Sequence, residues 1–136
     1  ADSTWYLGYV ANLSPWRGQT VRIAFHYHGE QADKWYIDDL CIGDENLGGE
    51  SPVPLVCAWS EGFDVPGYPG FPPEWSTPPG SANESSNDWR TSSMQYHGTS
   101  SPTSALIEPS TQSFTTVDRY LVSPDIVLPA TPGATP

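Results

Sequence analysis

The sequence predicts an all-β fold, an antiparallel β-sandwich, and three observations support this. The chain has 136 residues, enough for one domain with a hydrophobic core. Fifteen prolines and twelve glycines interrupt it so often that long helices have little room. Between these interruptions lie short segments rich in aromatic and β-branched residues, which are typical of strands.

The clearest predicted strand covers residues 20–28. Its side chains alternate with period two, as expected for a strand with one buried face. Val21, Ile23, Phe25 and Tyr27 share one face, and Arg22, Ala24, His26 and His28 share the other. The remaining segments that we expect to form strands are 4–13, 34–42, 53–59, 103–108, 117–123 and 125–128.

Two segments are expected to lack regular structure. Residues 66–93 form a long Pro/Gly/Ser/Asn-rich loop, in which Trp75 and Trp89 are predicted to anchor the chain to the core. Residues 129–136, PATPGATP, are expected to form a Pro/Thr-rich tail or linker after a single domain that spans residues 1–128.

Charge and composition exclude several functions. A net charge of -11, with five lysines and arginines, argues against nucleic acids and anionic membrane surfaces as partners. No apolar run approaches the roughly 20 residues that span a bilayer, so no membrane insertion is expected. The aromatic content of 12% excludes a disordered acidic tail. A chain that starts at Ala1 fits removal of a signal peptide, and equally a fragment. We expect a folded, secreted, extracellular or cell-surface protein.

Cys41 and Cys57 are the only two cysteines, and each lies in an apolar, strand-like segment. In an extracellular chain this favours a disulfide, which would contribute about 3 kcal/mol by restricting the unfolded chain. The alternative is a pair of buried free thiols. No CxxC or HxxxH spacing accompanies them, so a zinc site at these cysteines is not expected.

Two adjacent carboxylates, Asp38 and Asp39, lie within the strand-like run 35–43, WYIDDLCIG. If the run is one strand, successive side chains point to opposite faces and one aspartate points inward. An inward carboxylate without a partner is costly. The sequence therefore predicts a compensating group at this position.

Four segments resemble bacterial MAM-like jelly-roll domains of the cleaved-adhesin or choice-of-anchor J group. VRIAFHYHGEQADKWYIDDLCIG resembles the closing segment of those domains, and NLSPWRGQ resembles the lead-in to it. SEGFDVPGYPGFPPEW resembles their opening, and VDRYLVSPDIVL resembles their "D-x-W-L-(V/I)-S-P-x-I-x-L" motif. The resemblance implies a jelly-roll β-sandwich.

The two signatures stand in inverted order. The closing type occupies residues 5–43 and the opening type residues 59–128, and the usual middle strands are not recognisable. Three explanations remain open: a circular permutant, a fragment that bridges two tandem domains, or a subunit completed by a neighbouring copy's strands.

The resemblance also implies a structural Ca²⁺. Its carboxylate ligands would be Asp38 and Asp39 from the closing type and Glu61 and Asp64 from the opening type, with Asp88 as a weaker candidate. Ca²⁺ takes six to eight oxygen ligands, so a cation here would compensate an inward aspartate. The alternative is that these acids are solvated strand and loop residues.

No catalytic residues are expected, because no GxSxG, HExxH or Gly-rich phosphate loop is present. His26 and His28 share one strand face and could chelate Zn²⁺ or Cu²⁺, but no third ligand has a convincing spacing. We therefore interpret them as exposed strand histidines.

Carbohydrate binding is the main alternative function, as a module of a larger extracellular adhesin or enzyme. Trp16, Trp59 and Trp75 lie at strand ends or in loops, where they could stack on sugar rings, although such residues more often anchor a core. Asn83 lies in an N-glycosylation sequon, and Asn12 lies in a second one that Pro15 weakens.

The expected function is a non-catalytic adhesive or structural role at a cell surface. The predicted partners are identical subunits, joined by strand exchange or edge pairing into a filament or surface assembly, and glycans. Unpaired sheet edges left by the missing middle strands would need such a partner.

Overall fold

The computed structural model describes residues 10–30, 34–43, 57–64, 72–78, 88–93, 103–107 and 116–131. The described part is all-β apart from one 3-10 turn, η1 (Ser14–Trp16). Its strands are β1 (Thr20–Val21), β2 (Ala24–Glu30), β3 (Trp35–Ile37), β4 (Leu40–Gly43), β5 (Cys57–Glu61), β6 (Arg90–Ser92), β7 (Ser104–Ile107), β8 (Thr116–Val122) and β9 (Ile126–Val127).

All ladders among the described residues are antiparallel, and nearly all of them connect the two halves of the chain. β1 pairs with β9, β2 with β8, β3 with β7, and β4 with β5. The ladder between β6 and β7 is the exception among the described strands, since both belong to the second half. Strands of the closing-type segment therefore pair with strands of the opening-type segment.

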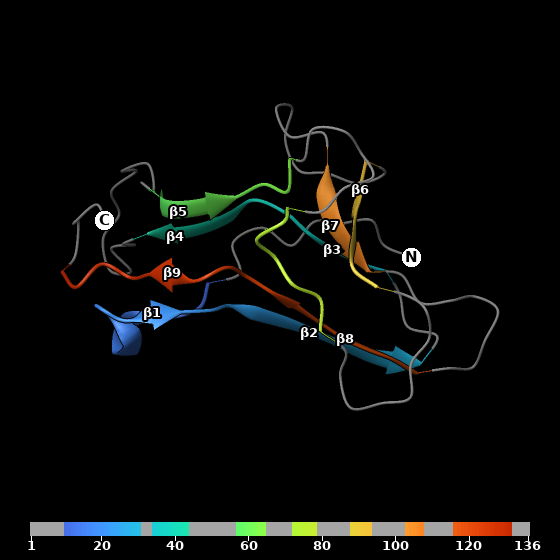
Figure 1. Ribbon diagram of the computed structural model, residues 1–136, viewed down its shortest axis with the longest axis horizontal. Coiled ribbons are helices and arrows are strands. Elements are labelled where there is room, and N and C mark those ends of the chain that lie inside the picture. The colour runs from blue at the N-terminus through green and yellow to red at the C-terminus, as the bar shows by residue number, and fades with distance from the viewer. Residues whose placement is uncertain are drawn as a thin grey trace.

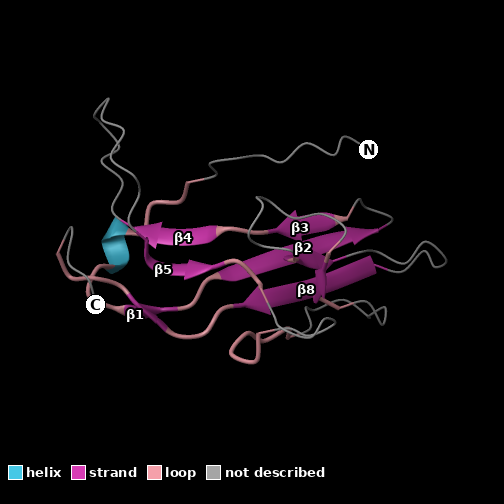
Figure 2. Cartoon of the chain, turned by 90° about the horizontal axis from the view of Figure 1, so that it is seen from above, coloured by secondary structure: helices cyan, strands magenta, loops and turns pink. Residues whose placement is uncertain are grey.

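The sheets form two layers, as expected for a β-sandwich (Figure 1). β1–β9 and β2–β8 make one layer, and β4–β5 and β3–β7–β6 make the other. In Figure 2, β3 and β4 lie end to end along the second layer. The antiparallel sheets confirm the predicted all-β class, while the jelly-roll strand order stays a prediction.

The hydrophobic core lies between these layers. Its buried residues come from both of them and from the connecting segments: Tyr27, Ile37, Phe63, Trp75, Trp89, Ala105, Ile107, Val117 and Leu121. Trp75 and Trp89 are 7% and 5% exposed, which confirms that the indoles of the long loop anchor it to the core.

The segment 20–28 has the predicted alternation of faces. Tyr27 is buried and Phe25 half-buried, whereas His26 and His28 are exposed. The segment is nevertheless two strands rather than one, because the ladder is interrupted at residues 22–23.

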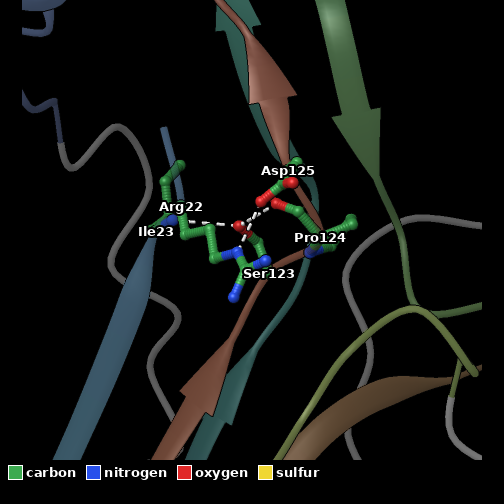
Figure 3. Close-up of polar contacts among 5 residues, drawn as sticks. All are labelled: Arg22, Ile23, Ser123, Pro124 and Asp125. Carbon is green, nitrogen blue, oxygen red and sulfur yellow. Dashed lines mark hydrogen bonds and ion pairs between the residues drawn. The ribbon is translucent and has the colours of Figure 1, made fainter. Parts of the chain in front are cut away.

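A bulge causes this interruption (Figure 3). Two residues of one strand, 22–23, face three residues of the other, 123–125, between the pairs Val21↔Ile126 and Ala24↔Val122. Pro124 has no N–H to give to a ladder. The Ser123 hydroxyl replaces the lost bonds: it accepts from the Ile23 N–H at 2.9 Å and donates to the Pro124 carbonyl at 2.8 Å.

The other predicted strands differ at their boundaries. Of the segment 4–13, residues 10–13 lie outside any strand and residues 4–9 lie outside the described part. β5 begins at Cys57, and residues 53–56 are likewise not described. The prediction that residues 66–93 lack regular structure is wrong at β6, whose three residues are too few to show a periodic pattern.

Candidate functional site

The Asp38–Asp39 pair is the point where the predicted strand 35–43 breaks. β3 ends at Ile37 and β4 begins at Leu40, so the prediction of one continuous strand is wrong. Asp39 is exposed with a φ of 49°, a left-handed conformation that aspartate tolerates better than most residues. The Asp38 carboxylate accepts a hydrogen bond from the Asp39 N–H at 2.9 Å. A local bond of this kind competes with the ladder, so strand alternation no longer forces either carboxylate inward.

Glu61 ends β5 directly beside this break, since it pairs with Leu40 across the ladder. One carboxylate oxygen accepts from the Phe63 N–H at 2.7 Å, and the other accepts from the Trp75 indole N–H at 3.0 Å. Phe63 has a φ of 54° and is fully buried. Glu61 therefore holds a left-handed turn and a core tryptophan together.

The two remaining predicted calcium ligands lie further along the chain. Asp64 is exposed and follows the Phe63 turn. Asp88 is exposed and binds its own loop, accepting from the Trp89 N–H at 2.8 Å and from the Thr77 hydroxyl at 3.0 Å. Local hydrogen bonds thus account for both oxygens of the Asp88 carboxylate.

The described residues do not bring the five predicted calcium ligands into one tight cluster. Asp38, Asp39, Glu61 and Asp64 come from two neighbouring segments joined by the β4–β5 ladder, whereas Asp88 precedes β6. No three of these five have ligand atoms within 4.8 Å of one another, in the part of the chain that is described. Glu61, like Asp88, already accepts a hydrogen bond at each carboxylate oxygen. The calcium site stays a prediction.

Cys41 and Cys57 form a disulfide, with their Cα atoms 5.3 Å apart, which confirms the predicted bond and excludes free thiols. The bond joins β4 to β5 where the ladder is irregular, between the pairs Ile42↔Trp59 and Gly43↔Cys57. Disulfides persist in oxidising environments.

The candidate sugar-stacking tryptophans differ in accessibility. Trp75 is buried against Phe63, with ring centroids 5.1 Å apart. Trp59 is half-buried and packs against the same core. Only Trp16, in η1, is strongly exposed among the three, at 47%.

The two predicted glycosylation positions have different outcomes. Asn12 is exposed, and its side-chain oxygen accepts a hydrogen bond from the Ser14 N–H at 2.9 Å, at the start of η1. Asn83 lies outside the described residues.

A second cluster of metal-ligand type lies on the outer face of the β2–β8 ladder. His28 is directly opposite Asp118, and His26 is opposite Tyr120. Asp118 bridges both histidines: one carboxylate oxygen lies 2.7 Å from His26 Nε2, and the other lies 3.7 Å from His28 Nδ1. Among the described residues, these three form the one group of His, Cys, Asp and Glu whose ligand atoms all lie within 4.8 Å.

Sequence reasoning missed Asp118 as the third member of this cluster. His26 and Asp118 are 92 positions apart, and periodicity identifies the face of a strand but not the strand beside it. The motif His-x-His was a usable signal for two ligands. To identify the third ligand, Asp118, the register between β2 and β8 must be known.

Within the described part, no helix is long and apolar enough to cross a membrane. Comparison with known protein families, curated proteins and solved structures finds no match for this chain. The resemblance to MAM-like domains therefore rests on the four sequence segments alone.

Proposed function

We propose that this chain is a non-catalytic structural module of an extracellular or cell-surface assembly, built by pairing between closing-type and opening-type segments of identical copies. One observation supports the proposal most directly. In four ladders, a strand that precedes residues 44–56 pairs with a strand that follows them. These ladders are β1–β9, β2–β8, β3–β7 and β4–β5. The same surfaces can pair within one chain or between two, which is the basis of strand exchange.

Head-to-tail exchange fits an adhesive or filamentous role. If β1–β4 of one copy complete β5–β9 of the next, the contact is heterologous and continues into rings or open filaments. An exchanged ladder would bury the same core residues as the closed form. A net charge of -11 opposes association of copies, and bound Ca²⁺ would reduce that repulsion.

The disulfide gives this proposal a direct test. Cys41 lies on β4 and Cys57 on β5, so exchange across that ladder turns the bond between them into a link between chains. We expect protein oxidised at high concentration to form a ladder of covalent multimers on a non-reducing gel, and a single monomer band after reduction. A Cys41→Ser, Cys57→Ser variant controls for assembly without covalent links, measured by light scattering.

The opposite outcome is equally clear. A protein that stays monomeric at high concentration, with every disulfide formed within its own chain, contradicts the assembly proposal. The self-contained permuted sandwich would then be the better account.

Calcium is the proposed cofactor of this module. An extracellular-type dissociation constant of about 10⁻⁴ to 10⁻³ M means that millimolar Ca²⁺ adds on the order of 1 kcal/mol to stability. EGTA should lower the melting temperature, and Asp38→Asn with Asp39→Asn should abolish that response. Glu74→Gln, at an exposed position outside the predicted ligands, is the matched control. A melting temperature that does not respond to EGTA contradicts the site.

A carbohydrate-binding module is the second candidate, favoured by the exposed ring of Trp16. Aromatic rings on a β-sandwich surface can stack on sugars. The test is a glycan array probed with monomeric protein. Binding that Trp16→Ala abolishes would favour this function, and an array without signal would remove it.

A further inference from the structure

We propose that His26, His28 and Asp118 form a binding site for a transition-metal ion of the zinc class, on the outer face of the β2–β8 ladder. The proposal is independent of the calcium prediction, because it uses different residues on a different ladder. It holds whether β2 and β8 come from one chain or from two, because the register between the two strands is the same.

The register of the ladder places the three side chains together. His26 and His28 are two positions apart on β2, so both point to the same face. Asp118 is the direct cross-strand partner of His28. Its carboxylate lies between the two imidazoles, with one oxygen near each ring.

The distances suit a small four-coordinate ion. Zn²⁺ binds nitrogen and carboxylate oxygen at about 2.0–2.2 Å, so two tetrahedral donors lie roughly 3.3 Å apart. One Asp118 oxygen lies 2.7 Å from His26 Nε2 and the other lies 3.7 Å from His28 Nδ1, so the two nitrogen–oxygen spacings lie on either side of that value, each with a different oxygen. All three ligand atoms lie within 4.8 Å of one another, so only small side-chain rotations are needed to enclose an ion.

Burial and ring stacking organise the site in advance. The Asp118 side chain is only 4% exposed, which fixes the carboxylate, while the His26 and His28 side chains are 44% and 57% exposed. The His26 ring stacks on Tyr120, with centroids 4.2 Å apart and planes 9° from parallel. The buried side thus holds the anchoring ligand, and the open side leaves the fourth position to water.

The donor set selects the class of metal. Imidazole nitrogen suits Zn²⁺, Cu²⁺ and Ni²⁺, whereas Ca²⁺ needs six to eight oxygen ligands and finds one carboxylate here. A bound ion would join β2 to β8, and hence residues 24–30 to residues 116–122, by bonds stronger than the ladder's own hydrogen bonds.

The test is a calorimetric titration of the full chain with ZnCl₂. Excess Ca²⁺ is present throughout, so that carboxylates elsewhere in the chain are already occupied. We expect one Zn²⁺ per chain and perturbation of the imidazole signals of His26 and His28 in the NMR spectrum. Replacing a metal ligand should weaken binding at least as much as loss of an outer-shell partner, about 10- to 100-fold. His28→Gln tests this loss at an exposed position, which keeps the fold intact.

His97→Gln is the matched control, since it removes the chain's third histidine and should leave the affinity unchanged. Co²⁺ in place of Zn²⁺ should give visible absorption typical of a tetrahedral site, and His28→Gln should remove it. A wild-type chain that binds no Zn²⁺, or a His28→Gln variant with wild-type affinity, would overturn the proposal.

Discussion

Replacing Glu61 by glutamine should destabilise the fold without changing its shape. The carboxylate accepts two hydrogen bonds, from the Phe63 N–H at 2.7 Å and from the Trp75 indole N–H at 3.0 Å. A glutamine side chain has the same size but only one oxygen, and its NH₂ group donates. One of the two N–H groups would therefore face another donor.

The magnitude follows from the burial of the two donors. Phe63 is fully buried and Trp75 is 7% exposed, so most of the surface around both donors is closed to bulk water. A buried donor left unsatisfied costs about 1–3 kcal/mol, and the bond lost was to a charged acceptor, at the upper end of that range. We expect Glu61→Gln to lower the free energy of unfolding by about 2–3 kcal/mol, a large part of the 5–15 kcal/mol usual for a domain.

Urea unfolding followed by fluorescence and circular dichroism measures this loss as a shift in midpoint at constant slope. Trp75→Phe removes the indole N–H and completes a double-mutant cycle with Glu61→Gln. The double variant should lose less unfolding free energy than the sum of the losses in the two single variants. A Glu61→Gln variant within about 0.5 kcal/mol of wild type, or an additive cycle, would refute the structural role of this carboxylate. Repeating the measurement in EGTA separates that role from calcium binding.

Three further changes test other parts of the fold. Reducing the bond between Cys41 and Cys57, or replacing both by serine, should cost about 3 kcal/mol of unfolding free energy, and a loss under 1 kcal/mol would contradict the loop-entropy estimate. Asp39→Gly should be more stable than Asp39→Ala by about 1 kcal/mol in EGTA, because the φ of 49° suits glycine. The reverse order of the two variants in thermal melts would argue against the left-handed turn. Ser123→Ala should cost about 1–2 kcal/mol, since the Ile23 N–H loses its acceptor, and Ser123→Thr keeps the hydroxyl as the control in urea unfolding.

The sequence was sufficient for features that depend on local pattern. Alternation identified the buried and exposed faces of residues 20–28, since period two follows from strand geometry. The buried state of Trp75 and Trp89 was also predicted, because large aromatic side chains in a polar loop need apolar surroundings. The disulfide followed from the presence of just two cysteines in an extracellular-type chain.

Features that depend on neighbours across the sheet were out of reach. The break at Asp39 results from a local hydrogen bond and a left-handed turn that override the apolar pattern around them. The partner of His26 and His28 depends on the register of β8, which is fixed by tertiary packing. The role of Glu61 likewise depends on where the Trp75 indole lies in the folded core.

The long-range ladders also determine when this chain can fold. The bonds from Arg22 to Asp125, Ile23 to Ser123 and His26 to Asp118 connect residues 103, 100 and 92 positions apart. A large loop must close before each of these contacts forms, and its closure costs chain entropy. Folding should therefore be slower than in sandwiches of the same size that are rich in hairpins. At a synthesis rate of about 5–20 residues per second, β1 and β2 emerge on the order of ten seconds before β8 and β9. During that interval β1 and β2 lack their partner strands, so their backbone edges are open to a neighbouring nascent copy or a chaperone.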